Sequence, residues 1–420
     1  MKHVICGNGI AGVSAAEAIR YLDPSAQITF ISKEPHLPYS RPMISLVLAG
    51  LARNSEIFIR NQNFYENLGA KVLSGDEAAS IDLQTKTVFT KSGAQISYDR
   101  LLIATGADPR PIKAQGTDLA GIHFMRNRDQ VAGLLQNIAT CKKALVLGGG
   151  LVGFKAAYGL MLRGIAVHML ISSGHPLSMQ LDETAGKIVL KKLLEKGLTV
   201  SVGAFVEAFS GEKGWVKTAH LKDGSSLDCD LVVIGKGVSP TLDFARKSGL
   251  ETDLGLLVDR FLETNSPGVY AAGDVAQAWD LVHRSTWVNA IWPVAAEQGR
   301  LAGMNMAGRK TAYAGGMGRN VMRVFDLDVM TGGMVNPPTD PGFQVISRLG
   351  YDQTSYARLV LKENRLVGMA LVGNVEQGGV LLSLIKNQAD LPMDPADLLE
   401  PGFNYGSLIS TIRPLPRPVF

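Results

Sequence analysis

Cysteine is scarce, because the 420 residues include only Cys6, Cys141 and Cys229, which are far apart in the sequence. This excludes a disulfide-stapled fold, and the lack of a CxxC pair argues against a zinc site, an iron–sulfur cluster or a redox dithiol. We expect the three to be buried thiols in or beside core strands. The seven histidines are scattered without ligand spacing, so no metal site is predicted.

An excess of charge of one sign and long apolar runs are also lacking. The 42 basic and 38 acidic residues give a net charge of +4 without clusters, which argues against a nucleic-acid partner. No run of eighteen apolar residues would span a bilayer, and strand-like residues from Lys2 onward argue against a secretory signal. We therefore expect a cytoplasmic protein that is not bound to a membrane. The length of 420 residues predicts two or three domains, and a hydrophobic fraction of 46% with 19% charged residues predicts that they are ordered.

The chain begins with a pattern typical of dinucleotide binding. An apolar strand over 4–6 leads into Gly7-Asn8-Gly9-Ile10-Ala11-Gly12, after which 13–22 suits a helix and 27–31 a second strand. In this frame the first glycine permits a tight turn, the second lets the backbone approach a pyrophosphate, and the third lets the helix pack on the strand. The helix N-terminus then faces the phosphates. Glu34 follows the second strand and is expected to hold ribose hydroxyls.

The same pattern returns 141 residues later. A strand over 143–147 leads into Gly148-Gly149-Gly150-Leu151-Val152-Gly153, a helix runs to Arg163, and 166–171 forms the next strand. One GxGxxG is weak evidence, whereas two in the same strand–loop–helix–strand frame predict two dinucleotide-binding units.

Further motifs lie between and after these units. They read LLIATGADPR at 101–110, VVIGKGVSP at 232–240, TNSPGVYAAGD at 264–274 and WPVAAEQG at 292–299. Together with the glycine motifs, they resemble the two-dinucleotide flavoprotein reductases of the pyridine nucleotide–disulfide oxidoreductase superfamily. The segment PYSRPMIS at 38–45 is similar to the ferredoxin reductase, rubredoxin reductase and nitrite reductase flavin-domain branch. Residues 40–52 contain no cysteine, which excludes disulfide reduction.

The resemblance implies an α/β fold with two Rossmann-like domains arranged as in glutathione reductase, and an α+β interface domain. The FAD-binding domain would comprise 1–112 and 238–312, and the NAD(P)-binding domain 113–237. Strand-like stretches at 320–325, 343–348, 357–362 and 368–373 and a helix at 380–388 would belong to a C-terminal interface domain over 313–392. We expect the apolar, proline-rich tail 393–420 to dock on its own chain or on a partner.

The resemblance also assigns cofactor roles. Asp274 would accept hydrogen bonds from the ribityl and phosphate region of FAD, and a helix starting at Trp292 would point N–H groups at the pyrimidine end of the flavin. The FAD-binding set is Gly7, Gly9, Ile10, Ala11, Gly12, Glu34, Arg41, Pro42, Ala78, Ala104, Thr105, Gly106, Gly273, Asp274, Trp292 and Pro293. The NAD-binding set is Gly148, Gly150, Leu151, Val152, Gly153, Ser172 and Gly237.

Two positions depart from the superfamily pattern together. Members with a lysine near flavin N5 usually place a glutamate opposite it, on the second glycine-motif helix, and this chain has Leu46 and Lys155 instead. We hypothesise that Lys155 supplies the cation beside N5, which makes it the candidate catalytic residue. The alternative is that Lys155 lies toward solvent.

A third departure concerns the coenzyme. An acidic residue normally ends the second strand of the nicotinamide domain and binds the adenosine ribose, but here Ile171 or Ser172 stands there. Without this acid the site should discriminate only weakly against NADPH. However, no arginine is nearby to bind a 2′-phosphate. His168 and His175 would be at most weak contacts. We expect NAD(H), with NADP(H) not excluded.

The reaction implied is hydride transfer between nicotinamide and flavin N5, followed by single-electron exchange with an iron–sulfur protein. The partner would be ferredoxin, rubredoxin or a subunit of a larger complex, because the chain has no iron–sulfur ligand set of its own. Flavin subunits of tungsten-dependent aldehyde oxidoreductases are similar in size and cofactor content, which favours an oligomer or hetero-complex. The alternatives are a redox-regulated scaffold of the apoptosis-inducing-factor type and a stand-alone NADH oxidase.

Overall fold

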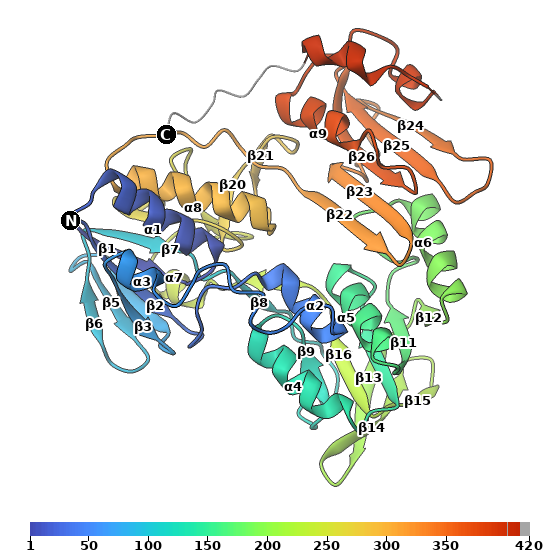
Figure 1. Ribbon diagram of the computed structural model, residues 1–420, viewed down its shortest axis with the longest axis horizontal. Helices are drawn as coiled ribbons and strands as arrows, with labels where there is room; N and C mark the ends of the chain where they lie inside the picture. The colour runs from blue at the N-terminus through green and yellow to red at the C-terminus, as the bar shows by residue number, and fades with distance from the viewer. Residues whose placement is uncertain (401, 412–420) are drawn as a thin grey trace. The chain divides into compact units, whose positions relative to one another are not determined.

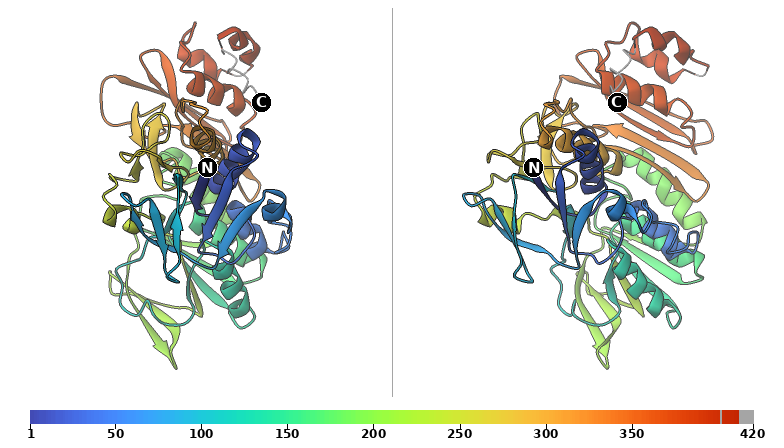
Figure 2. Two further views of the ribbon diagram at one scale, coloured as in Figure 1. Left: turned by 90° about the vertical axis from the view of Figure 1, so that its left-hand side faces the viewer. Right: turned by 60° about the vertical axis from the view of Figure 1, so that its left-hand side comes forward.

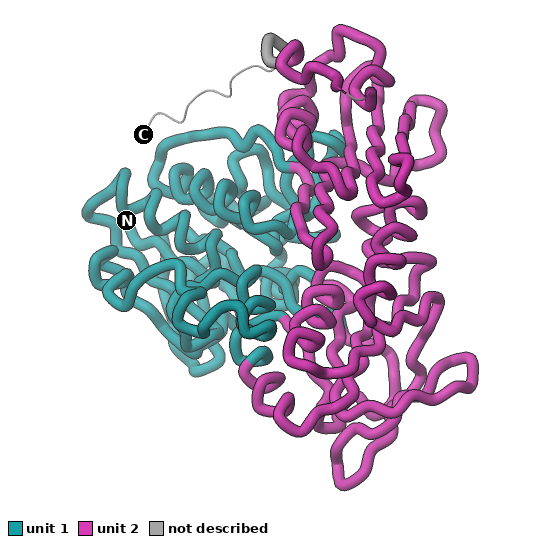
Figure 3. The backbone as a smooth tube through the Cα atoms, turned by 45° about the vertical axis from the view of Figure 1, so that its right-hand side comes forward, with its two compact units in different colours: residues 1–110, 126–131, 238–316 teal, residues 111–125, 132–237, 317–420 magenta. Residues whose placement is uncertain are grey.

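The computed structural model describes residues 1–400 and 402–411 and divides into two compact units (Figure 3). Unit 1 comprises residues 1–110, 126–131 and 238–316. Unit 2 comprises residues 111–125 and 132–237 together with the described residues from 317 onward. Each unit contains its own five-stranded parallel sheet. The expected domain boundaries near 112, 237 and 312 stay a prediction.

The parallel sheet of unit 1 has the strand order β19-β7-β1-β2-β3, of which β7, β1, β2 and β3 are labelled in Figure 1. Its strands are β1 (Lys2–Cys6), β2 (Gln27–Ser32), β3 (Ala70–Ser74), β7 (Arg100–Ile103) and β19 (Val269–Ala271). The side chains of Val4, Ile5 and Cys6 are buried, which explains why the second half of β1 is apolar. Helix α1 (Ile10–Leu22) follows β1 and begins three residues before the expected start at Val13. The helix ends at Leu22, because Pro24 disfavours helical geometry in Asp23, the residue that precedes it.

Helix α1 packs closely against α8 (Trp292–Met306) in unit 1, as both Figure 1 and Figure 2 show. The contact depends on glycine, because a Cβ at Gly299 would lie 2.1 Å from the Ala11 carbonyl oxygen and one at Gly303 2.3 Å from that of Ala15. Larger side chains at these two positions of α8 would therefore push α8 away from α1.

The remaining elements of unit 1 are short. They are η1 (Arg41–Met43), α2 (Ile44–Ala49), α3 (Phe64–Asn67), β4 (Ala78–Asp82), β5 (Thr87–Thr90), β6 (Gln95–Ser97), β8 (Ala107–Pro109), β17 (Val238–Pro240), α7 (Asp243–Lys247), β18 (Leu256–Leu257), β20 (Ala276–Asp280) and β21 (Ser285–Trp287). Strands β4, β5 and β6 form an antiparallel sheet, β18, β20 and β21 form another small sheet, and β8 pairs with β17.

The parallel sheet of unit 2 has the order β12-β11-β10-β16-β9. Its strands are β9 (Ile122–Phe124), β10 (Lys143–Leu147), β11 (Ala166–Ile171), β12 (Thr199–Val202) and β16 (Leu231–Ile234), and its helices are α5 (Leu151–Leu162), α6 (Glu183–Glu195) and the larger part of α4 (Arg128–Ile138). An antiparallel sheet follows, made of β13 (Val206–Glu212), β14 (Trp215–Leu221) and β15 (Ser226–Asp228). The second expected strand–loop–helix–strand unit is thus present.

An antiparallel sheet with a helix completes unit 2, in the order β22-β23-β26-β25-β24. Its elements are β22 (Arg319–Val324), β23 (Leu327–Gly333), β24 (Phe343–Leu349), β25 (Tyr356–Lys362), β26 (Arg365–Val372), α9 (Gly378–Asn387), η2 (Pro395–Leu399) and η3 (Tyr405–Thr411). The expected strands and helix after 313 are confirmed within a few residues, and the expected α/β fold class with an α+β C-terminal part is confirmed. Strand β23 was not predicted.

The described part of the tail lies on its own domain. The Arg348 guanidinium donates to the Leu399 carbonyl oxygen over 2.9 Å, and Leu398 and Leu408 are buried. Residues 401 and 412–420, the rest of the expected docking tail, lie outside the described residues. No helix in the part of the chain that the structure describes is long and apolar enough to cross a membrane.

Candidate functional site

The first glycine loop, between β1 and α1, has the geometry of a dinucleotide cradle. Gly7 has φ +120°, and a Cβ there would lie 2.1 Å from the Ala104 carbonyl oxygen. A Cβ at Gly12 would lie 2.1 Å from the Gly7 carbonyl oxygen, so both glycines are needed for packing. A Cβ at Gly9 would meet nothing within 4 Å. The opening beside Gly9 and the first N–H groups of α1, at Ile10 and Ala11, therefore suit a pyrophosphate.

The second glycine loop, between β10 and α5, has the same geometry. Gly148 has φ +114°, and a Cβ there would lie 2.4 Å from the Gly235 carbonyl oxygen. A Cβ at Gly153 would lie 1.9 Å from the Gly148 carbonyl oxygen, whereas one at Gly150 would meet nothing within 4 Å. In each unit, the middle glycine of this loop therefore faces open space at the N-terminus of a helix. In unit 2 the first residues of that helix are Leu151 and Val152. Both loops fit a dinucleotide.

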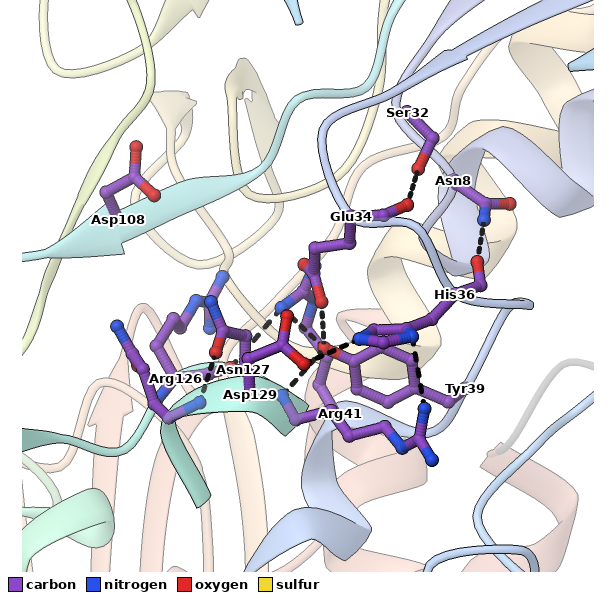
Figure 4. A network of polar contacts seen from close by, with 12 residues as sticks. Asn8, Ser32, Glu34, His36, Tyr39, Arg41, Asp108, Arg126, Asn127 and Asp129 are labelled. Atoms are coloured by element: carbon purple, nitrogen blue, oxygen red, sulfur yellow. Dashed lines mark hydrogen bonds and ion pairs between the residues drawn. The ribbon is translucent and has the colours of Figure 1, made fainter. Parts of the chain in front are cut away.

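Glu34 lies just past β2 in a polar network of unit 1 (Figure 4). One carboxylate oxygen pairs with the Arg41 guanidinium, and the other accepts a hydrogen bond from the Tyr39 hydroxyl. Burial raises the pKa of Tyr39 far above its ordinary value, so this hydroxyl stays a donor. The network holds Glu34 at the end of the strand. Its role toward ribose hydroxyls stays a prediction.

Arg126 joins this network and was missed by the sequence analysis. Its guanidinium donates to Asp274 over 2.7 Å and to the Ala107 carbonyl oxygen over 2.8 Å, and its own carbonyl oxygen accepts from Arg41 over 3.3 Å. Asp274 therefore has a cationic partner 148 residues away in sequence. Such a pairing leaves no local sequence pattern that could have predicted it.

His36 forms a second unpredicted cluster in the same part of unit 1 (Figure 4). Its Nε2 lies 2.6 Å from an Asp129 carboxylate oxygen, and its Nδ1 lies 3.1 Å from an Arg128 guanidinium nitrogen. Asn8, inside the first glycine loop, donates to the His36 carbonyl oxygen over 2.9 Å. The loop after β2 is therefore tied to both the glycine loop and the start of α4.

The other predicted FAD residues lie in unit 1. Ala104 follows β7 and donates its N–H to the Cys6 carbonyl oxygen over 2.8 Å, and Thr105 donates to the Thr241 carbonyl oxygen over 3.3 Å. Gly106 and Gly273 have positive φ, Pro42 lies in η1, Ala78 begins β4, and Trp292 and Pro293 begin α8 as expected. Their contact with FAD stays a prediction.

The end of β11 resolves which residue stands at the expected ribose position. The Ile171 side chain is fully buried, and a Cβ at Gly149 would lie 2.9 Å from it, whereas Ser172 is exposed. Ser172 is therefore the residue that faces outward. Its hydroxyl accepts a hydrogen bond from the Lys236 ammonium over 3.1 Å. This lysine lies 64 residues away in the sequence, so the residues around Ser172 give no sign of it.

The two histidines considered near this site have structural partners. His168, on β11, lies 2.8 Å from the Ser201 hydroxyl through Nε2, and burial lowers its pKa. The His175 ring packs against Gly186 on α6, where a Cβ would lie 2.1 Å from Nδ1. Gly237 has φ +88° and follows Lys236 directly.

Lys155, the candidate catalytic residue, lies on the first turns of α5 and is half-buried. Among the described residues it has no hydrogen bond or ion pair, and burial lowers its pKa. Leu46, on α2, is 38% exposed. A place for Lys155 beside flavin N5 stays a prediction.

The three cysteines are not activated. Burial raises the pKa of Cys6 and Cys229 to about 12 and that of Cys141 to about 11. All three thiols therefore stay protonated near neutral pH. The described residues contain no group of three or more His, Cys, Asp or Glu side chains placed to hold a metal ion.

Comparison with known proteins identifies two family matches along the chain. The family described as pyridine nucleotide-disulphide oxidoreductase matches residues 1–299, and the one described as rubredoxin NAD+ reductase C-terminal domain matches residues 319–389.

Individual relatives match most of the chain. It is 29% identical over 402 residues to the assimilatory nitrate reductase electron transfer subunit of Bacillus subtilis, which covers 95% of this chain but only 51% of that protein. The chain thus spans about half the length of that relative. It is 31% identical over 395 residues to the NADH-dependent phenylglyoxylate dehydrogenase subunit epsilon of Aromatoleum evansii, covering 93% and 92% of the two chains. The crystal structure of NADH:rubredoxin oxidoreductase from Clostridium acetobutylicum matches with a TM-score of 0.77 and 27% identity, over 94% and 97% of the two chains.

Proposed function

Because this chain belongs to the pyridine nucleotide-disulphide oxidoreductase family, we propose that it is an FAD-dependent NAD(P)H oxidoreductase that exchanges single electrons with an iron–sulfur protein. The observation that carries the proposal is the pair of glycine loops. Gly9 and Gly150 each border open space at the start of a helix, one in each unit. Two dinucleotides, one flavin and one nicotinamide, match two such loops.

Bound FAD would supply the chemistry that links two-electron hydride transfer to single-electron transfer. The chain's part is to bind and orient the dinucleotides. The N–H groups at the start of α1 bind the pyrophosphate, and Glu34 binds ribose hydroxyls. Asp274, oriented by Arg126, would accept hydrogen bonds from the ribityl hydroxyls. The N-terminus of α8, at Trp292, directs its positive end at the flavin.

The proposed chemistry uses no protein thiol. Helix α2 carries no cysteine, and the pKa values of all three thiols lie far above neutrality. Lys155 is proposed as the cation beside flavin N5, which would stabilise the negative charge of the reduced flavin. The absence of an ion-pair partner for Lys155 among the described residues supports a role toward a bound group.

The proposed electron partner is a separate iron–sulfur protein or subunit. The printed names of its relatives describe an electron transfer subunit, a dehydrogenase subunit and a rubredoxin oxidoreductase. These names support membership of a hetero-complex, in which this chain would be the nicotinamide-linked flavin subunit. Purification of the tagged chain from its native source, with metal analysis of stoichiometric partners, distinguishes a subunit from a free reductase.

An anaerobic titration tests the proposal directly. The purified chain is loaded with FAD and titrated with NADH, and separately with NADPH, while the visible flavin bands are followed. We expect at least one coenzyme to bleach the flavin within seconds. Stable flavin bands with both coenzymes would overturn the proposal and favour a scaffold whose flavin is not reduced by nicotinamide.

A further inference from the structure

The adenosine end of the second dinucleotide fold lacks the acid that favours NADH. In this fold the residue after the second strand faces the adenosine ribose, and an acid there accepts hydrogen bonds from the 2′-hydroxyl and repels a 2′-phosphate. Ile171 points into the core of unit 2, so Ser172 is the outward residue at this position. A serine neither repels a phosphate nor supplies charge.

A cation lies next to that serine. The Lys236 ammonium donates to the Ser172 hydroxyl over 3.1 Å from the loop that follows β16. In the order β11-β10-β16 this loop and the end of β11 both lie at the carboxyl edge of the sheet, on either side of β10. The Gly235 N–H donates to the Leu147 carbonyl oxygen over 2.8 Å, which fixes the loop against the second glycine loop.

The charge of Lys236 is not neutralised by the chain. Among the described residues the Ser172 hydroxyl is its hydrogen-bond partner, and no carboxylate pairs with it. Lys236 is half-buried as a residue, and its contact with Ser172 lies at the exposed surface, where an incoming group can reach the ammonium. An ammonium has three N–H donors, which leaves two for the oxygens of an incoming group. The neighbouring Ser173 is already engaged, since it donates to the His175 carbonyl oxygen over 2.9 Å.

We propose that Lys236 and Ser172 bind the 2′-phosphate of NADPH, so that the second dinucleotide site takes NADPH at least as readily as NADH. The phosphate dianion supplies the counter-charge that Lys236 lacks, and the serine hydroxyl offers it a further hydrogen bond. This reverses the preference for NADH that followed from the absence of an arginine. The inference rests on the proposed function, in which this domain binds the nicotinamide coenzyme.

The test measures binding at the adenosine end without any flavin chemistry. Isothermal titration of the full FAD-loaded chain compares adenosine 2′,5′-bisphosphate with 5′-AMP, in the wild type and in Lys236→Met. We expect the wild type to bind the bisphosphate about tenfold or more tightly than 5′-AMP. Lys236→Met should reduce that preference to about twofold or less while leaving the affinity for 5′-AMP unchanged. Lys222→Met, which removes an exposed lysine of unit 2, is the matched control and should keep the preference.

Two results would overturn the inference. One is equal affinity of the wild type for both nucleotides, and the other is a Lys236→Met variant that loses affinity for both to the same extent. The second outcome would place Lys236 at the 5′-phosphate instead of the 2′-phosphate.

Coenzyme titration of the variants separates this inference from the proposed function. Ser172→Asp should raise KM for NADPH and leave kcat nearly unchanged, because it repels the phosphate far from the reacting atoms. If NADH bleaches the flavin but the bisphosphate is not preferred, the proposed function stands and the inference fails. If neither coenzyme bleaches the flavin, the proposed function fails whatever the nucleotide preference.

Discussion

Single buried charges and unpaired polar groups decide much of this chain's behaviour at the scale of the residue. His3, on β1, is 1% exposed, and neither imidazole nitrogen has a hydrogen-bond partner among the described residues. Lys155 and Lys236 are half-buried residues whose ammonium groups have no carboxylate partner in the same described part of the chain. A buried polar or charged group without a partner lowers the free energy of unfolding, unless a change of protonation or a bound ligand compensates it.

Because His3 is buried without a hydrogen-bond partner among the described residues, we expect the protein to lose stability in mild acid. Burial lowers its pKa from 6.5 to about 4 in the folded chain, so the unfolded chain binds the proton more tightly. The free energy of unfolding should therefore fall as the pH drops from 6.5 to about 4, by up to about 3 kcal/mol. Urea denaturation across this pH range should show the slope in the wild type. Replacement by a neutral apolar residue, His3→Leu, should flatten it, and an equal slope in both proteins would contradict the assignment.

Replacing Lys155 should change the midpoint potential of the flavin. If its ammonium lies beside N5, Lys155→Met removes a positive charge where the reduced flavin gains a negative one, so reduction becomes less favourable. We expect the midpoint potential to fall by tens of millivolts and hydride transfer to slow, measured by anaerobic spectroelectrochemistry and stopped flow. Lys155→Arg keeps the charge and should restore most of both. An unchanged potential and rate in Lys155→Met would mean that the lysine only faces solvent.

At the scale of the element, the two strand–loop–helix units have the same glycine-loop geometry. In each, the outer glycines are held by backbone contacts and the middle glycine borders open space, although the two loops share only the glycines and the frame. The middle glycines, Gly9 and Gly150, have extended backbone conformations that other residues adopt readily. Substitution at the middle position should therefore affect ligand binding and not folding.

Substitutions in the loops should separate the two cofactors. Gly9→Val should fold but lose FAD, since the new side chain fills the space beside the start of α1. Gly150→Val should keep FAD but resist reduction by NADH and NADPH. Gly12→Ala, whose Cβ would meet the Gly7 carbonyl oxygen, should instead lower the free energy of unfolding by about 1–3 kcal/mol. Flavin content, coenzyme bleaching and denaturation distinguish the three, and full FAD in Gly9→Val would contradict the cradle.

The elements that the sequence predicted are those with a local signature. The β1–α1–β2 and β10–α5–β11 units were predicted because strand, glycines and helix follow one another directly. Strand β23 was missed because its glycines at 332 and 333 resemble a loop, and only pairing with β22 and β26 makes it a strand. In the candidate site, Arg126 beside Asp274 and Lys236 beside Ser172 were missed for a related reason. Both pairs join residues far apart in sequence, where no short pattern signals the contact.

At the scale of the whole molecule, unit 2 joins the second parallel sheet to the C-terminal antiparallel sheet through a polar contact. Asp182, just before α6, accepts a hydrogen bond from the Tyr356 hydroxyl over 2.8 Å, and the Arg358 guanidinium lies 3.6 Å from the same oxygen. The Asp182 and Arg358 side chains are only 13% and 19% exposed. The other Asp182 oxygen is buried without a partner in the described part of the chain. Loss of the arginine would thus leave a buried carboxylate poorly compensated.

This contact predicts that Arg358→Met destabilises unit 2. We expect the free energy of unfolding to fall by about 3 kcal/mol, because the Asp182 carboxylate stays buried with only Tyr356 to compensate it. Arg365→Met, which breaks the exposed pair with Asp390, is the matched control and should leave the stability nearly unchanged. Chemical denaturation measures both. Similar losses in the two variants would show that burial of the Asp182 pair has no special weight.

The central claim is that the chain couples a two-electron coenzyme to a single-electron partner. The most direct measurement loads the protein with FAD, reduces it anaerobically with one equivalent of coenzyme, and mixes it with oxidised [2Fe–2S] ferredoxin or rubredoxin while the carrier's own absorption is followed. The account predicts that about two carrier molecules are reduced per flavin, because each accepts one electron. A flavin that stays reduced with both carriers, and is reoxidised only when dioxygen is admitted afterwards, would contradict it and indicate an oxidase.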